Sequence, residues 1–112
     1  MKIYHNPRCK KSRAGLEFMK KQGLDPEIRF YLDDRLTKEE LKKLLRKLKL
    51  PVEELVRTQE DYYKQELKGK QFSEDEWISI LVEHPKLIKR PIIETEKMAV
   101  IGDPVENIQP FL

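Results

Sequence analysis

Near its start the chain reads Lys2-Ile3-Tyr4-His5-Asn6-Pro7-Arg8-Cys9-Lys10-Lys11-Ser12-Arg13. This stretch contains the only cysteine of the chain. Residues 2–5 are expected to form a short β-strand, and residues 14–22 have helical spacing, with Gly15, Phe18 and Met19 on one face. Cys9 is therefore expected in a loop that leads from a strand into a helix.

The surroundings of Cys9 favour ionisation of its thiol. Four cations flank it, and the helix that follows presents unpaired N–H groups and the positive end of its dipole. In such places the pKa of a cysteine falls from about 8.5 to roughly 3.5–7.5. The alternative is a buried cysteine that acts as a small hydrophobic residue. The basic neighbours Arg8, Lys10, Lys11 and Arg13 disfavour burial, so the sequence predicts a reactive thiolate.

Length and composition predict one soluble globular domain. The chain has 112 residues, and hydrophobic and charged residues each make up 38% of it. A single cysteine cannot form an internal disulfide. The chain opens without a signal-peptide pattern and contains no apolar run of membrane-spanning length. We therefore expect a protein of the reducing cytoplasm with no membrane partner.

The charges do not indicate a nucleic-acid partner or a metal site. The 23 basic residues nearly balance the 20 acidic ones, for a net charge of +3. The densest basic run, residues 38–49, alternates with leucines at helical spacing and has no aromatic residue for base stacking, so it predicts a solvated helix face. Two isolated histidines and one cysteine are too few for a zinc site.

Two capping boxes mark the helices of the middle of the chain. Thr37 with Glu40 predicts the start of a helix with a leucine stripe on one face. Ser73 with Glu76 predicts a second helix, which ends before Pro85.

The remaining segments predict strands and a final helix. Residues 27–32 alternate apolar and polar side chains, and residues 92–93 and 99–101 are expected to form a hairpin. The last helix is expected to begin with Asp103 as its N-cap and Pro104 at its first position.

This order of elements predicts an α/β fold of the thioredoxin type. The expected core is a mixed sheet formed by an N-terminal βαβ unit and a C-terminal ββα unit. A helical insertion, approximately residues 37–84, separates the two halves. The whole chain, residues 1–112, is expected to form a single domain.

The motifs add specificity to this prediction. The pattern Tyr4-His5-Asn6-Pro7-x-Cys9-x-x-Ser12-Arg13 resembles the active-site opening of the glutaredoxin-coupled arsenate reductase (ArsC-like) family, which has a thioredoxin-like fold. The family's downstream pattern is matched by Leu55-Val56-Arg57 and by His84-Pro85-Lys86-Leu87-Ile88-Lys89-Arg90-Pro91-Ile92. The resemblance covers essentially the whole chain.

This resemblance implies a site and a chemistry. Cys9 is then the nucleophile, with its thiolate supported by His5, Ser12 and Arg13. Arg57 and Arg90 are the residues that bind a small oxyanion such as arsenate, and Pro91 is a cis-proline facing Cys9. The family binds no cofactor and uses glutathione and glutaredoxin as external reductants. Arginine suits anion binding because its planar fork meets two oxygens at once.

Several residues keep a second interpretation. Each arginine could form an ordinary surface ion pair. His5 could tune the thiolate or cap the first strand with a hydrogen bond, and His84 is expected to end a helix rather than to take part in chemistry.

Asp103 is a departure from the family pattern, because it stands where the family has a third oxyanion-binding arginine. A carboxylate there repels an anion and puts arsenate specificity in doubt, and Lys10 and Lys11 could compensate in part.

A second class of function is non-catalytic. Spx-type regulators share the fold and bind RNA polymerase, but they carry a second cysteine three positions after the first, as a redox switch. Ser12 occupies that position here. A disulfide switch is therefore impossible, whereas polymerase binding through the helical insertion stays open.

Overall fold

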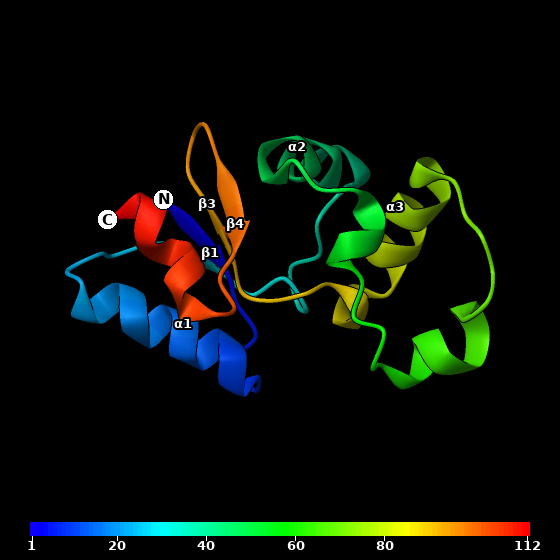
Figure 1. The fold of residues 1–112 in the computed structure, drawn as a ribbon, viewed down its shortest axis with the longest axis horizontal. Helices are drawn as coiled ribbons and strands as arrows, with labels where there is room; N and C mark the ends of the chain where they lie inside the picture. The colour runs from blue at the N-terminus through cyan, green and yellow to red at the C-terminus, as the bar shows by residue number, and fades with distance from the viewer. The chain divides into compact units, whose positions relative to one another are not determined.

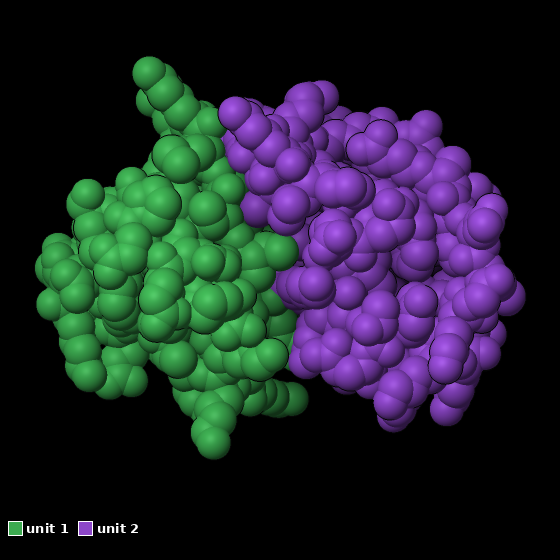
Figure 2. All heavy atoms as spheres, viewed as in Figure 1, with its two compact units in different colours: residues 1–34, 90–112 green, residues 35–89 purple.

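The computed structural model describes all residues, 1–112, and divides into two compact units. Figure 2 shows them in different colours. Residues 1–34 and 90–112 form the first, which we call the sheet unit, and residues 35–89 form the second, the helical unit. The helical unit contains the whole of the expected insertion. That both units belong to one domain stays a prediction.

The sheet unit consists of a four-stranded mixed sheet and two helices. Its elements are β1 (Lys2–Tyr4), α1 (Lys10–Lys21), β2 (Glu27–Arg29), β3 (Ile92–Glu94), β4 (Ala99–Ile101) and the 3₁₀-helix η4 (Val105–Phe111). The strand order is β2-β1-β3-β4. β1 runs parallel to β2, whereas β1 with β3 and β3 with β4 pair antiparallel. The predicted βαβ and ββα halves of a thioredoxin-like sheet are thus confirmed.

One face of this sheet carries the core of the sheet unit. Successive side chains of a strand point to opposite faces. Ile3 pairs with Ile93 across β1 and β3, and both are completely buried together with Met19 of α1 and Ile108 of η4. In Figure 1 α1 and the C-terminal helix η4 lie side by side next to the strands. Burial of these apolar side chains attaches both helices to one face of the sheet.

Two elements differ in length from the sequence prediction. α1 begins at Lys10 rather than Ala14, because its first turn is basic and carries no apolar periodicity that would have marked it. β2 ends at Arg29 rather than Leu32. The chain turns there, since the backbone N–H groups of Asp33 and Asp34 both donate to the Phe30 carbonyl oxygen, at 3.1 and 2.9 Å.

The predicted start of the last helix is wrong. η4 begins at Val105 after an extended Pro104, and it has no side-chain cap at its N-terminus. Asp103 is therefore not its N-cap. The Asn107 side-chain amide donates instead to the Ile101 carbonyl oxygen at 3.0 Å. Pro110 lies inside η4 and has no N–H to donate, which is unfavourable for a regular α-helix and compatible with a short 3₁₀-helix.

The helical unit consists of five short helices. They are α2 (Lys38–Leu48), the 3₁₀-helix η1 (Val52–Leu55), the π-helix η2 (Tyr63–Leu67), α3 (Glu74–Glu83) and the 3₁₀-helix η3 (Pro85–Leu87). The leucines that α2 buries are Leu41, Leu44, Leu45 and Leu48, as the stripe in the sequence predicted. No helix of the chain is both long enough and apolar enough to span a membrane.

Both predicted capping boxes are present. The Thr37 hydroxyl accepts from the Glu40 N–H at 3.1 Å, and the Glu40 carboxylate accepts from the Thr37 N–H at 2.9 Å. Ser73 and Glu76 form the same pair of bonds, at 3.2 and 2.9 Å. α3 ends at Glu83 with His84 as its C-cap, which confirms the helix end expected there.

Candidate active site

Cys9 is the N-cap residue of α1. Its backbone is extended (φ −93°, ψ 123°), and its carbonyl oxygen already accepts from the Arg13 N–H at 3.0 Å. No side chain caps this helix, and its first turn contains no acidic residue. The first N–H groups of α1 therefore have no intrahelical acceptor. Two of them, from Lys11 and Ser12, donate to the sulfur of Cys9.

These contacts lower the pKa of the Cys9 thiol. Burial of the sulfur is the largest single effect and opposes ionisation. The Ser12 N–H, the Arg90 guanidinium and the Lys11 N–H together outweigh it. The thiolate is thus stabilised by a helix N-terminus and by one arginine from the other end of the chain, rather than by the side chains of the four neighbouring cations.

A buried polar network holds the loop that carries Cys9. The Nδ1 atom of His5 and the hydroxyl oxygen of Ser12 are 2.7 Å apart, and the Ser12 oxygen also accepts from the Asn6 N–H at 3.0 Å. Ser12 is completely buried and His5 almost so. Burial, with the charges of Lys20 and Arg13, lowers the pKa of His5. The shift favours the neutral form of His5, which contacts the Cys9 loop through Ser12.

Asn6 is a part of this loop that the sequence analysis did not single out. Its carbonyl oxygen accepts from the Cys9 N–H at 3.0 Å, and its side-chain oxygen accepts from the Arg8 N–H at 3.0 Å. Asparagine side chains commonly close such turns by bonding to a backbone N–H two residues on. The Asn6-Pro7 pair was the signal for this turn.

Two of the four cations beside Cys9 have other partners. The Arg13 guanidinium donates to the Pro7 carbonyl oxygen at 2.9 Å and so closes the loop. Lys11 Nζ lies 3.2 Å from a carboxylate oxygen of Asp103. The Asp103 carboxylate thus faces the first turn of α1 and neutralises one of the two lysines that we expected to compensate for it.

Arg90 joins this group from the segment before β3. Its side chain forms a hydrogen bond with Cys9, and the Arg90–Pro91 peptide bond is cis, as the resemblance implied. Within the sheet unit the structure therefore brings together Cys9, Ser12 and Arg90. His5 and Arg13 contact the same loop.

Arg57 belongs to the helical unit. Its N–H donates to the Leu87 carbonyl oxygen at 2.7 Å, and its guanidinium donates to the Glu60 carboxylate at 2.6 Å. The side chain is only 16% exposed. An anion at Arg57 would therefore compete with a carboxylate for the guanidinium.

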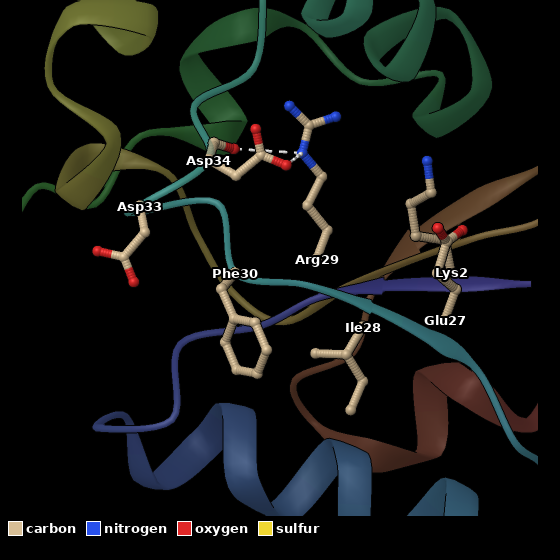
Figure 3. Close-up of a pocket in the computed structure, with 7 residues that line it drawn as sticks. All are labelled: Lys2, Glu27, Ile28, Arg29, Phe30, Asp33 and Asp34. Carbon is tan, nitrogen blue, oxygen red and sulfur yellow. Dashed lines mark hydrogen bonds and ion pairs between the residues drawn. The ribbon is translucent and has the colours of Figure 1, made fainter.

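A cavity of about 430 Å³ lies along β2 and contains none of the predicted site residues (Figure 3). Its lining mixes the charges of Lys2, Arg29, Glu27, Asp33 and Asp34. Arg29 is paired with Asp34, whose backbone oxygen and carboxylate lie 3.2 and 3.4 Å from Nε. Opposite charges here do not make an anion site. Nor do three or more His, Cys, Asp or Glu side chains cluster anywhere in the structure to hold a metal ion.

The fold and the site together define a class of protein. A mixed β2-β1-β3-β4 sheet places a cysteine at the N-terminus of its first helix and an Arg-cis-Pro segment before β3. That combination is a thioredoxin-like α/β protein with a thiolate-stabilising helix end.

Comparison with known proteins identifies the family. The family model described as "ArsC family" matches residues 4–111, and the chain belongs to this family. The chain is 37% identical to an arsenate reductase of Neisseria meningitidis, over 100% of this chain and 97% of that one. It is 41% identical to the uncharacterized protein YfgD of Escherichia coli K12, over 96% and 92%. The structure of an arsenate reductase from Vibrio cholerae superposes with a TM-score of 0.93 and 40% identity, over 99% and 96%.

Proposed function

We propose that the protein is a thiol-dependent oxidoreductase of the arsenate reductase type, with glutathione and glutaredoxin as its reductants. The observation that carries the proposal is the environment of Cys9. Its sulfur receives two N–H groups of a helix N-terminus and the Arg90 guanidinium. These groups stabilise an anionic nucleophile and suit an incoming oxyanion as well. The names of the relatives support arsenate as the substrate.

In this scheme the Cys9 thiolate attacks the arsenic(V) atom of arsenate. An S–As bond forms and one As–O bond breaks, and the departing oxygen leaves as water after taking up protons. A glutathione thiolate then attacks the Cys9 sulfur. The electron pair of the S–As bond stays on arsenic, which becomes arsenic(III) and leaves as arsenite, while Cys9 and glutathione form a mixed disulfide.

Regeneration requires an external thiol, which we propose glutaredoxin supplies. The chain has no other cysteine to open the mixed disulfide. A glutaredoxin thiolate attacks the glutathione sulfur and releases the Cys9 thiolate, by ordinary thiol–disulfide exchange. No bound cofactor is required because thiols supply both electrons. Such a cycle suits the reducing cytoplasm, where glutathione keeps thiols reduced.

The test is arsenite production from arsenate by the purified chain with glutathione and glutaredoxin. Cys9→Ser should abolish it, and Arg90→Lys should reduce it, because a lysine cannot reproduce the planar fork of arginine. Arg46→Lys, an exposed arginine on α2, is the matched control and should keep full activity.

Two outcomes would refute the proposal. One is arsenite production that persists in Cys9→Ser. The other is turnover that runs equally well on thioredoxin alone. Absence of arsenite together with retention of RNA polymerase on the immobilised chain would instead support the Spx-like alternative.

A further inference from the structure

Two buried glycines of the sheet unit lie against the ring of Pro91. An added Cβ atom at Gly15, in the interior of α1, would lie 2.7 Å from Pro91 Cγ. At Gly102, directly after β4, it would lie 2.5 Å from Ile93 Cδ1 and 3.2 Å from Pro91 Cγ. Gly102 also donates its N–H to the Pro91 carbonyl oxygen at 2.8 Å. Pro91 is thus enclosed from two sides by residues without side chains.

Conformation does not require glycine at either position. The positive φ angles of glycines in this chain are at Gly23 and Gly69, not at these two. Glycine is among the poorest helix formers, so Gly15 weakens the middle of α1. What these positions do require is space, because only a residue without a Cβ lets the proline ring approach α1 and the end of β4 this closely.

We propose that Gly15 and Gly102 are positioning residues that seat Pro91 against α1 and thereby hold the adjacent Arg90 beside the sulfur of Cys9. This inference rests on the proposed role of Cys9 as the nucleophile. Both glycines act through a buried proline ring, and neither contacts the substrate. The chain of contacts runs from the glycines to Pro91, then through one peptide bond to Arg90, whose side chain bonds to Cys9.

The test is the pH dependence of Cys9 alkylation by iodoacetamide in the Gly15→Ala variant. Its added methyl group displaces Pro91, so we expect the profile to move to higher pH. At a pH well below the pKa of Cys9, a fall of about threefold in the rate corresponds to a pKa rise of about half a unit. Arg90→Gln removes the guanidinium completely, so its shift in the alkylation profile is the upper limit for the shift in Gly15→Ala.

Two further variants separate positioning from a general structural effect. Gly15→Ala in an Arg90→Gln background should shift the profile no further than Arg90→Gln alone, because both changes remove the same contact. Ala14→Gly weakens the same turn of α1 at an exposed position. It should lower the melting temperature and leave the alkylation profile unchanged.

Gly102→Ala provides a second route to the same answer if Gly15→Ala does not fold. Adding Ile93→Val removes the Cδ1 atom that lies 2.5 Å from the new methyl group and should restore part of the wild-type profile. An unchanged profile in folded Gly15→Ala or Gly102→Ala would overturn the inference, as would additive shifts in the double variant. Because alkylation needs no arsenate, these results are independent of whether arsenite is formed.

Discussion

The N-terminus of α1 differs from the N-termini of α2 and α3. Thr37 and Ser73 each cap their helix with a hydroxyl and close a capping box with a glutamate. Cys9 occupies the same N-cap position in α1 without a side-chain cap, and the first turn there has no acidic residue. The two capped helix ends satisfy their own N–H groups, whereas α1 presents them to a sulfur atom. The uncapped N-terminus of α1 leaves N–H groups available to an anion, here the Cys9 thiolate.

The largest expected effect comes from giving α1 a capping residue in place of Cys9, so that its N-terminus resembles those of α2 and α3. Cys9→Ser replaces the proposed nucleophile with a residue that is a good N-cap. We expect complete loss of arsenite production and a melting temperature at or above that of the wild type. Activity assays and thermal melting of one preparation check both. A variant that loses activity only because it melts much earlier would contradict the comparison.

Arg90→Gln tests the arginine contact at the N-terminus of α1, which has no counterpart at α2 or α3. Loss of the guanidinium should raise the pKa of Cys9 toward that of a free thiol, because a cation and hydrogen-bond donor beside the thiolate disappears. At a pH well below the pKa of Cys9, the rate of alkylation should fall about tenfold for each unit that the pKa rises. Arg46→Gln serves as the control and should keep the wild-type pH profile.

Removing the caps of α2 and α3 should have the opposite effect: stability falls, and the reactivity of Cys9 stays the same. Thr37→Ala and Ser73→Ala each lose one side-chain bond to a helix N–H, at a cost of about 0.5–2 kcal/mol of unfolding free energy. Neither change should alter the alkylation of Cys9. Denaturant titration and the alkylation profile measure the two properties separately, and a slowed alkylation in either variant would show that the helix ends are coupled.

The helix ends should also differ in their sensitivity to acid. The pKa of His5, which bonds to Ser12 in the first turn of α1, is lowered from 6.5 by burial and by Lys20 and Arg13. The unfolded chain therefore takes up the proton first, and stability is lost as the pH falls from about 6.5 toward the lower folded value.

In the α3 box the pKa of Glu76 is lowered from 4.5 by the Ser73 backbone and side chain, so its contribution is lost only as the pH falls below about 4.5. Denaturant titrations at pH 7.5, 5.5 and 4 measure the two ranges. His5→Gln should reduce the loss of unfolding free energy between pH 7.5 and 5.5.

The smallest expected effect concerns Asp103, which faces the first turn of α1 through Lys11. Asp103→Arg should improve the apparent affinity for arsenate, because it replaces a repulsive carboxylate with a cation. Since Asp103 does not cap η4, the stability change should stay within about 1 kcal/mol, the usual range for exposed ion pairs. Steady-state kinetics and thermal melting report the two effects. An unaltered KM would show that Arg90 and the helix N–H groups suffice.

Local signals in the sequence predicted the elements whose determinants are local. Thr37 with Glu40 and Ser73 with Glu76 mark α2 and α3 because a capping box lies within four residues. The start of α1 was missed, since its first turn is basic, with Lys10, Lys11 and Arg13 exposed, and carries no apolar periodicity. Asp103 was assigned as a cap from its position before Pro104, and the extended conformation of Pro104 excluded it.

Local signals in the sequence predicted only part of the candidate site. The position of Cys9 before a helix followed from periodicity, and its lowered pKa from that helix end; the side chains of the four neighbouring cations, which we also expected to lower it, are not the cause. That Arg90 lies beside it came from a family resemblance, because no spacing in the chain links residues 81 positions apart. The roles of Gly15 and Gly102 depend on which side chain packs against them, and a single sequence does not contain that information.

The order in which the sheet unit is completed has a consequence for the newly made chain. β1 pairs with β3, and the arginine beside Cys9 comes immediately before β3. On the ribosome, β1 and α1 emerge long before residues 90–112, and domains generally fold during synthesis from the N-terminal side. Until the C-terminal hairpin arrives, Cys9 lacks its arginine. The arginine contact that lowers the pKa of Cys9 therefore forms only after residue 90 has been synthesised.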